Sequence, residues 1–199
     1  LSSAINGSSI ARGTSFLKDK MGADIFAPSV TIIDDPHRRR GLRSAAFDDE
    51  GLATQRRNII DQGKLTTWFL DLRSARQLGL QSTGHAGRGV SSPPSPGASN
   101  LYLQAGELSV ADLIKDIKAG FLVTELIGMG VSTVTGDYSR GASGFWIENG
   151  EISHAVSEVT VAGHLSDMFK SLTPANDLEF LYGVDAPTVR IEGMTLAGS

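Results

Sequence analysis

The histidines are the first candidates for chemistry, because a neutral imidazole is a common protein ligand for zinc. His37, His85, His154 and His164 are scattered along the chain. A helical metal site needs two ligands on one face, at positions i and i+4, as in the His-Glu-x-x-His pattern. No two histidines of this sequence have that spacing. We therefore interpret them as ordinary surface or core residues, and we expect no metal site among them.

Other short patterns resemble known motifs without completing them. The run 141–144 lacks the Gly-x-Ser-x-Gly spacing of a nucleophile elbow. The glycines of 128–130 and 84–89 lack the dinucleotide and Walker spacings, so we interpret them as bends or points of close backbone approach. The acidic residues 48–50 have no EF-hand spacing, and the basic run 38–40 is too short to indicate nucleic acid. We expect both to be solvated loops.

The segment 135–146, TGDYSRGASGFW, is unusual on local grounds. It places Asp137, Tyr138, Ser139 and Arg140 between two apolar runs, with three glycines nearby. Glycine allows another backbone to approach closely, and a rigid aromatic ring beside a planar guanidinium is typical of recognition surfaces. A polar hairpin loop without a binding role explains the same residues equally well. We therefore treat these four residues as candidates for binding a substrate or a partner protein.

Composition and charge limit the classes of protein that this chain can represent. Its 199 residues are 40% hydrophobic and 20% charged, which suffices for one domain with a sizeable core or for two small ones. The formal net charge of -4 gives no indication of the basic surface that nucleic-acid binding requires. The lack of cysteine excludes a disulfide framework and fits a cytoplasmic protein. No apolar run approaches the roughly 20 residues that span a bilayer, so we expect no membrane partner.

Turn signals and hydrophobic periodicity predict the elements that would position these residues. The clearest helix covers 109–119, where Ser109 can cap the first turn and Gly120 supplies the stop. Asn149 and Gly150 predict a tight type I′ hairpin. Further helices are expected within the first 21 residues, over 74–80 and over 164–172. A strand is expected over 29–33, followed by a turn at 34–36. Two strands within 56–72 are expected to form a hairpin through the Gly-containing turn 61–64. The other expected strands cover 101–103, 121–127, 131–135, 144–148, 151–161 and 188–191.

The order of these elements does not alternate strictly as βαβ units. Hairpins dominate, so the sequence predicts an α+β fold made mainly of antiparallel sheet, with a few helices. Residues 81–100 are rich in Gly, Ser and Pro, and we expect a long, mobile and weakly packed loop there. The chain begins at Leu1, without Met, inside a run of small residues. We interpret it as a fragment of a longer protein.

Several segments together resemble the PmbA (TldE) branch of the TldD/PmbA peptidase family, which is also named for modulation of DNA gyrase. The most specific is the run 134–152, which contains TGDYSRGASGFW and the Asn-Gly turn. The segments 47–51, 75–84 and 158–163 agree with it, and 186–198 resembles the end of the family's proteins. The resemblance covers nearly the whole chain and implies the carboxy-terminal part of a longer protein.

This resemblance implies a partnership. TldD and TldE proteins are understood as a heteromeric, zinc-dependent peptidase that acts on unfolded peptides and matures peptide antibiotics. In the TldD subunit a His-Glu-x-x-x-His helix and a downstream Cys hold the zinc. The corresponding segments here, 2–8 and 176–184, contain no His and no Cys. The chain is therefore expected to bind no cofactor, with zinc held by a TldD partner, and to be inactive alone.

The resulting expectation is a non-catalytic subunit that binds a TldD-type partner, or a second copy of itself, and an unfolded peptide that adds a strand at a sheet edge. Two other classes stay open. One is a stand-alone hydrolase with an unrecognised site. The other is a binding protein related to gyrase or another toxin target, without a peptidase role.

Overall fold

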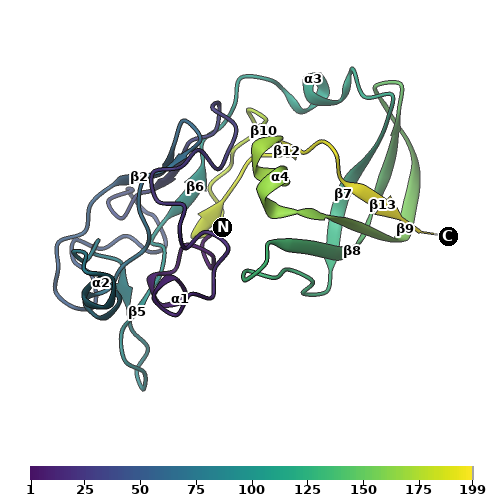
Figure 1. Cartoon of the computed structure of the whole chain (residues 1–199). Coiled ribbons are helices and arrows are strands. Elements are labelled where there is room, and N and C mark those ends of the chain that lie inside the picture. Colours follow the sequence, from purple (N-terminus) through teal and green to yellow (C-terminus); the bar gives the residue numbers. More distant parts are fainter. Residues whose placement is uncertain (199) are drawn as a thin grey trace.

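The computed structural model describes residues 1–198 and confirms the α+β class. Strands make up 34% of the chain and helices 12%, and most strand pairs are antiparallel. The two larger sheets lie on opposite sides of the molecule, with helix α4 and the β10–β12 ribbon between them (Figure 1). Among these residues, no helix is long and apolar enough to cross a membrane.

The helices are short and the strands are grouped in four sheets. The helices are α1 (Gly7–Ala11), α2 (Leu72–Leu78), α3 (Val110–Ile114) and α4 (Leu165–Lys170). The five-stranded sheet has the order β11 (Val184–Asp185), β6 (Leu101–Leu103), β1 (Ile32–Asp34), β2 (Arg57–Asp61) and β3 (Lys64–Leu65). The four-stranded sheet has the order β13 (Thr195–Ala197), β9 (Glu151–His164), β8 (Asp137–Glu148) and β7 (Ala119–Ile127). Two ribbons pair β4 (Ala86–Gly87) with β5 (Ser95–Pro96), and β10 (Thr173–Pro174) with β12 (Val189–Arg190).

The main hydrophobic core surrounds the five-stranded sheet. Ile5, Ile59, Ile60 and Leu65 are fully buried there, and α4 contributes Phe169. Burial of each such side chain stabilises the fold by about 1.5–3 kcal/mol relative to an exposed one. A second, smaller core lies on the four-stranded sheet. The molecule therefore has one large core, which holds α1 and α4 against the five-stranded sheet, and one small core.

Two predicted hairpin turns are confirmed. Asn149 and Gly150 join β8 to β9 with φ angles of 51° and 82°. Gln62 and Gly63 join β2 to β3 with φ angles of 48° and 86°. Two successive residues with positive φ match the right-handed twist of the flanking strands, which explains why turn chemistry alone located both hairpins.

The predicted helices exist, but their bounds differ. Ser109 caps α3 by accepting a hydrogen bond from the Asp112 amide, as expected. The expected extension to residue 119 is wrong, because α3 ends at Ile114 and Ala119 already pairs with Glu148 in the sheet. Helix α2 begins two residues earlier than predicted, because Asp71 rather than a later residue forms the capping box. Strand β1 likewise ends at Asp34, which was expected in a turn.

The largest correction concerns residues 131–144. The run 131–135 was expected to be a strand, but it is a loop with one isolated bridge at Val131. The run 136–143 was expected to connect two strands, but 137–143 is the first half of β8, in which 137–142 pair with β9 and 141–143 pair with β7. Gly144 shows the reason, because a Cβ atom there would collide with the Leu122 carbonyl oxygen of β7. Glycines that suggested a loop instead admit close strand packing.

Candidate functional site

The four candidate residues of the segment 135–146 lie on β8, which directs them to opposite faces of the four-stranded sheet. Alternate residues of a strand share a face. Tyr138 and Arg140 therefore lie on one face, together with the buried Ala142, whereas Asp137 and Ser139 lie on the other. The structure brings two of the four together and separates them from the other two. Their binding role stays a prediction.

Tyr138 and Arg140 have different surroundings on their shared face. Tyr138 is partly buried and packs against both hydrophobic cores. Arg140 donates from Nη2 to the carbonyl oxygen of Leu126 at 3.0 Å, while its buried Nε has no hydrogen-bond partner within residues 1–198. A buried donor without a partner costs about 1–3 kcal/mol. The unpaired Nε therefore lies inside the protein, and the hydrogen bond from Nη2 anchors the Arg140 side chain to strand β7.

Asp137 and Ser139 take part in the loop that precedes β8. The Asp137 carboxylate accepts a hydrogen bond from the Thr135 hydroxyl at 2.6 Å, and its carbonyl oxygen accepts one from the Ser132 amide at 2.9 Å. The Ser139 amide donates to the Gly130 carbonyl oxygen at 2.7 Å. These contacts shape the connection between β7 and β8, and the carboxylate of Asp137 takes part in it through Thr135.

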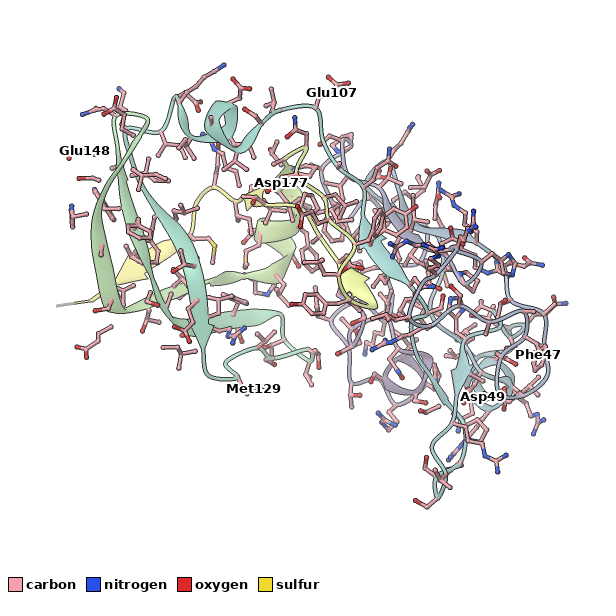
Figure 2. The ribbon with its side chains drawn as sticks, turned by 180° about the vertical axis from the view of Figure 1, so that it is seen from behind. Phe47, Asp49, Glu107, Met129, Glu148 and Asp177 are labelled. Carbon is pink, nitrogen blue, oxygen red and sulfur yellow. The ribbon has the colours of Figure 1, made fainter. Side chains whose placement is uncertain are left out.

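Strand β7 is a free edge of the four-stranded sheet, since only β8 pairs with it among residues 1–198. It has nine residues and exposes the apolar side chains of Val123, Leu126 and Ile127. Met129, in the loop that follows, extends into solvent (Figure 2). A long exposed edge presents unpaired N–H and C=O groups to which an extended chain can add. Arg140 therefore lies in the strand next to a suitable edge.

A cleft of about 290 Å³ opens beside the five-stranded sheet. One wall comes from the segment 36–54 and the other from the base of the β4–β5 ribbon. Phe47 and Asp49 lie close together on this outer side of the molecule (Figure 2). The Asp49 amide donates to the Ala86 carbonyl oxygen at 3.0 Å, and Asp48 accepts from the Ala86 amide at 3.2 Å. These bonds hold the two walls together.

A buried polar network forms the inner end of this cleft. The Asp34 carboxylate accepts hydrogen bonds from the Ser99 amide at 2.9 Å and from the Ser99 hydroxyl, and it lies 3.2 Å from His85 Nε2. The other imidazole nitrogen, Nδ1, lies 2.8 Å from the Thr83 hydroxyl. A neutral imidazole protonated at Nε2 satisfies both contacts, because Nδ1 then accepts from Thr83. Asp34 stands between Ser99 and His85, so the histidine cannot act as a base on that serine.

The amino-terminal segment that the resemblance compares with the zinc-binding helix does not fit a zinc ion. Ala4 and Ile5 are buried and carry no donor atom. Asn6 uses its side-chain oxygen to cap α1 at the Ser8 amide and its nitrogen to donate to the Pro96 carbonyl oxygen. Within residues 1–198, no group of three or more His, Asp, Glu or Cys side chains could hold a metal ion. The residues of this segment therefore offer no set of side-chain ligands for a zinc ion.

Sequence reasoning missed the cleft and its network. Asp34 and Ser99 are 65 positions apart, and nothing in their spacing predicts contact. Asp34 was interpreted as part of a turn, because it precedes Asp35 and Pro36. The one available signal was the isolated His85 inside a run of small residues, which indicates a histidine with a structural or polar role rather than a solvated one.

Comparison with protein families gives one consistent result. The family description PmbA/TldA metallopeptidase C-terminal domain matches residues 1–198. The curated protein Metalloprotease PmbA from Escherichia coli is 46% identical over 196 residues, which are 98% of this chain and 42% of that protein. The chain thus spans less than half the length of this relative.

Solved structures agree over the whole chain. A Bacteroides thetaiotaomicron protein, described as a candidate modulator of DNA gyrase, has a TM-score of 0.88 and 34% identity, covering 100% of this chain and 43% of its own. TldE from Thermococcus kodakarensis also has a TM-score of 0.88, with 26% identity, and covers 100% of this chain and 46% of its own. The two-sheet arrangement is therefore shared with proteins of both names.

Proposed function

The chain belongs to the PmbA/TldA metallopeptidase family, and from that membership we propose that it forms the metal-free, peptide-binding side of a TldD/TldE-type peptidase. Its proposed substrates are unfolded peptides, including precursors of peptide antibiotics. A TldD-type partner would hold the zinc and cleave the peptide. Family membership supports the reaction class, while the division of labour rests on the residues described above.

One observation carries the binding role: β7 is a free edge of nine residues with Arg140 in the adjoining strand. An extended peptide that adds to such an edge gains main-chain hydrogen bonds regardless of its sequence. This suits a protein that must accept many unfolded chains. The hydrogen bond from Arg140 Nη2 to the Leu126 carbonyl oxygen anchors the side chain to this edge strand, which would place the guanidinium beside a bound chain.

The division between subunits is supported by the segment around α1. Its buried positions are apolar, its one amide side chain is committed to a helix cap and to Pro96, and the chain has no cysteine. A catalytic zinc site needs three protein ligands and an open position for water or substrate. A partner subunit with such ligands would complete the enzyme.

The test uses the full-length protein together with a TldD-type partner. Arg140→Ala should lower kcat/KM for an unfolded peptide, or the affinity for the partner, by more than tenfold, because a recognition arginine typically costs about 2 kcal/mol on truncation. Arg76→Ala is the matched control, since Arg76 is an exposed arginine of helix α2, outside the four-stranded sheet. The control should retain activity within about twofold, which is about 0.4 kcal/mol.

Three results would contradict the proposal. Normal processing and normal association by a folded Arg140→Ala protein would leave the segment without a binding role. Peptide cleavage by the protein without a partner would favour a stand-alone hydrolase. Specific binding to gyrase without any cleavage by the assembled pair would favour a binding protein of the toxin-target class.

A further inference from the structure

The loop 36–44, here named the arginine loop, concentrates positive charge on a protein whose formal net charge is -4. Arg38, Arg39, Arg40 and Arg43 fall within six residues, and no acidic residue occurs between Pro36 and Phe47. None of the four arginines forms an ion pair within residues 1–198. Guanidinium groups without carboxylate partners are available to an external anion.

The arginine loop is held in one conformation by the buried side chain of Asn100, which is 2% exposed. Its oxygen accepts from the Arg43 amide at 3.0 Å, and its nitrogen donates to the Asp35 carbonyl oxygen at 2.8 Å and to the Ser44 hydroxyl oxygen at 3.0 Å. The Ser44 hydroxyl in turn donates to the Arg38 carbonyl oxygen at 2.6 Å. These bonds cross-link the loop, so the arginines project from a defined backbone.

The backbone of the loop also carries strain. Arg40 has a φ angle of 60°, a left-handed conformation that is unfavourable for a residue with a side chain. At Gly41, an added Cβ atom would lie 2.6 Å from Ser44 Oγ and 2.7 Å from Asn100 Nδ2. Non-glycine residues in such conformations persist where their surroundings impose them, and they concentrate at functional sites. The strain is therefore consistent with a loop shaped for recognition.

Two of the arginines pack against the segment 180–184. The Arg38 guanidinium lies 3.6 Å from the centre of the Phe180 ring, which also makes an edge contact with Tyr102 at 5.1 Å. Arg43 lies against the backbone of Gly183, where an added Cβ would meet its Nε at 2.7 Å. Beside them, the Tyr182 side chain is 68% exposed. The surface thus combines unpaired guanidinium groups with exposed apolar and aromatic side chains.

Two nearby carboxylates, Asp185 and Asp35, form no ion pair with the four arginines. Asp185 is buried and accepts hydrogen bonds from the amides of Leu181 and Tyr182. Asp35 accepts from the His37 amide and faces Arg56 at 4.0 Å. Both carboxylates are committed to contacts other than the four arginines. Arg43 also lines the cleft described above, so the surface and the cleft are continuous.

We infer that the arginine loop and the segment 180–184 recognise acidic stretches of extended peptides, whose neighbouring residues would enter the adjoining cleft. The inference rests on the proposed function and names a substrate class for it. Guanidinium groups fork onto carboxylates, and clusters of arginine are a recurring device for binding acidic motifs. The exposed aromatic and apolar side chains would contact the peptide between its acidic residues.

The charge distribution favours an acidic peptide over single-stranded nucleic acid. Proteins that bind a single strand present a basic groove that follows about 4–16 nucleotides. Here the basic residues occupy one short loop, and the acidic residues Asp48, Asp49 and Glu50 follow beside the cleft. A continuous phosphate backbone would be repelled there, whereas a peptide can place its carboxylates at the loop alone.

The experiment measures binding to the full-length protein by fluorescence anisotropy, without the partner and without cleavage. The probes are a labelled 12-residue peptide with four Glu residues and the same peptide with Gln at those positions. A triple variant combines Arg39→Gln, Arg40→Gln and Arg43→Gln. It should lower the affinity for the Glu peptide at least about tenfold and change the affinity for the Gln peptide less than about twofold. A control triple, Arg73→Gln with Arg76→Gln and Lys118→Gln, changes the net charge equally and should leave both peptides unaffected.

Equal weakening by the control triple would overturn the inference, because net charge alone would then explain binding. Unchanged affinity for the Glu peptide in the arginine-loop triple would do the same. Tighter binding of a labelled oligothymidylate, lost in that triple, would assign the surface to nucleic acid instead. The Arg140→Ala protein separates the two proposals, because it tests the β7 edge and should bind the Glu peptide normally at the arginine loop.

Discussion

The carboxylate of Asp34 and the imidazole of His85 meet inside the protein, with Oδ2 and Nε2 3.2 Å apart, although 51 positions separate them in the sequence. The side chains are 0% and 3% exposed. The contact joins the end of β1 to the base of the β4–β5 ribbon, and it forms the inner end of the cleft. It is one of the contacts that attach the ribbon, whose tip extends into solvent, to the body of the protein.

Removing the imidazole should destabilise the protein strongly. His85→Ala leaves a buried carboxylate with one donor fewer, and breaking such a contact typically costs about 3 kcal/mol. Urea denaturation should show a lower midpoint with an unchanged m-value. His85→Gln, which retains a donor, serves as the comparison and should lose less. A His85→Ala protein within about 0.5 kcal/mol of the parent would contradict a structural role for the pair.

The β4–β5 ribbon should be the first site of proteolysis. The tip of the hairpin next to β5 protrudes from the body (Figure 1). Its residues 87–93 are exposed, whereas Thr83 to Ala86 and Asn100 are buried. Exposed loop tips are the preferred sites of nicking. Brief trypsin treatment should therefore cut after Arg88 before it cuts in the arginine loop, which Asn100 holds in place. Mass spectrometry of the fragments checks this, and an initial cut within residues 119–164 would be inconsistent with it.

Arg190 should contribute stability that depends on pH. It donates to Asp116 at 2.6 Å and to the Leu113 carbonyl oxygen at 2.9 Å, and it pairs with Glu192. The hydrogen bond from Arg190 holds the pKa of Asp116 below its ordinary value. A depressed carboxyl pKa means that this stabilisation is present at neutral pH and is lost as the pH falls through the folded-state pKa, below about 3.9.

The matching experiment compares melting temperatures of the parent and Arg190→Gln. The variant should melt about 2 °C lower at pH 7, because exposed ion pairs contribute little, and the difference should shrink toward pH 3. Arg73→Gln, at an exposed arginine without an ion pair among residues 1–198, should show no such trend. If the difference in melting temperature stays constant or grows as the pH falls, the contact of Arg190 with the carboxylate does not cause it.

The chain should bind no stoichiometric zinc. The segment around Ala4 and Ile5 supplies no ligand, Asn6 is committed to its own hydrogen bonds, and no cysteine is present. Elemental analysis of protein purified without chelator should give well below about one zinc per chain, as a structural or catalytic site would require. A value near one would contradict this expectation. It would also contradict the proposal that only the partner subunit holds the zinc.

Much of the local structure followed from the sequence, where a single residue type imposes one backbone conformation. Asn149 and Gly150 adopt positive φ angles readily, so they located the β8–β9 hairpin. Ser109 located the start of α3, because its side chain satisfies a free amide of the first turn. The segment 134–152 also indicated the family, and the comparison with known proteins confirms the family membership.

Tertiary structure determined the strand pairing and the long-range side-chain contacts, because the residues next to a position in the sequence do not specify its partner. Gly141 suggested a loop, and only its pairing with β7 and β9 shows that it belongs to a long strand. That strand then separated Asp137 and Ser139 from Tyr138 and Arg140, through its alternating geometry. The Asp34–His85 contact and the anchoring of the arginine loop by Asn100 likewise join distant segments, since burial brings together polar groups that must satisfy one another.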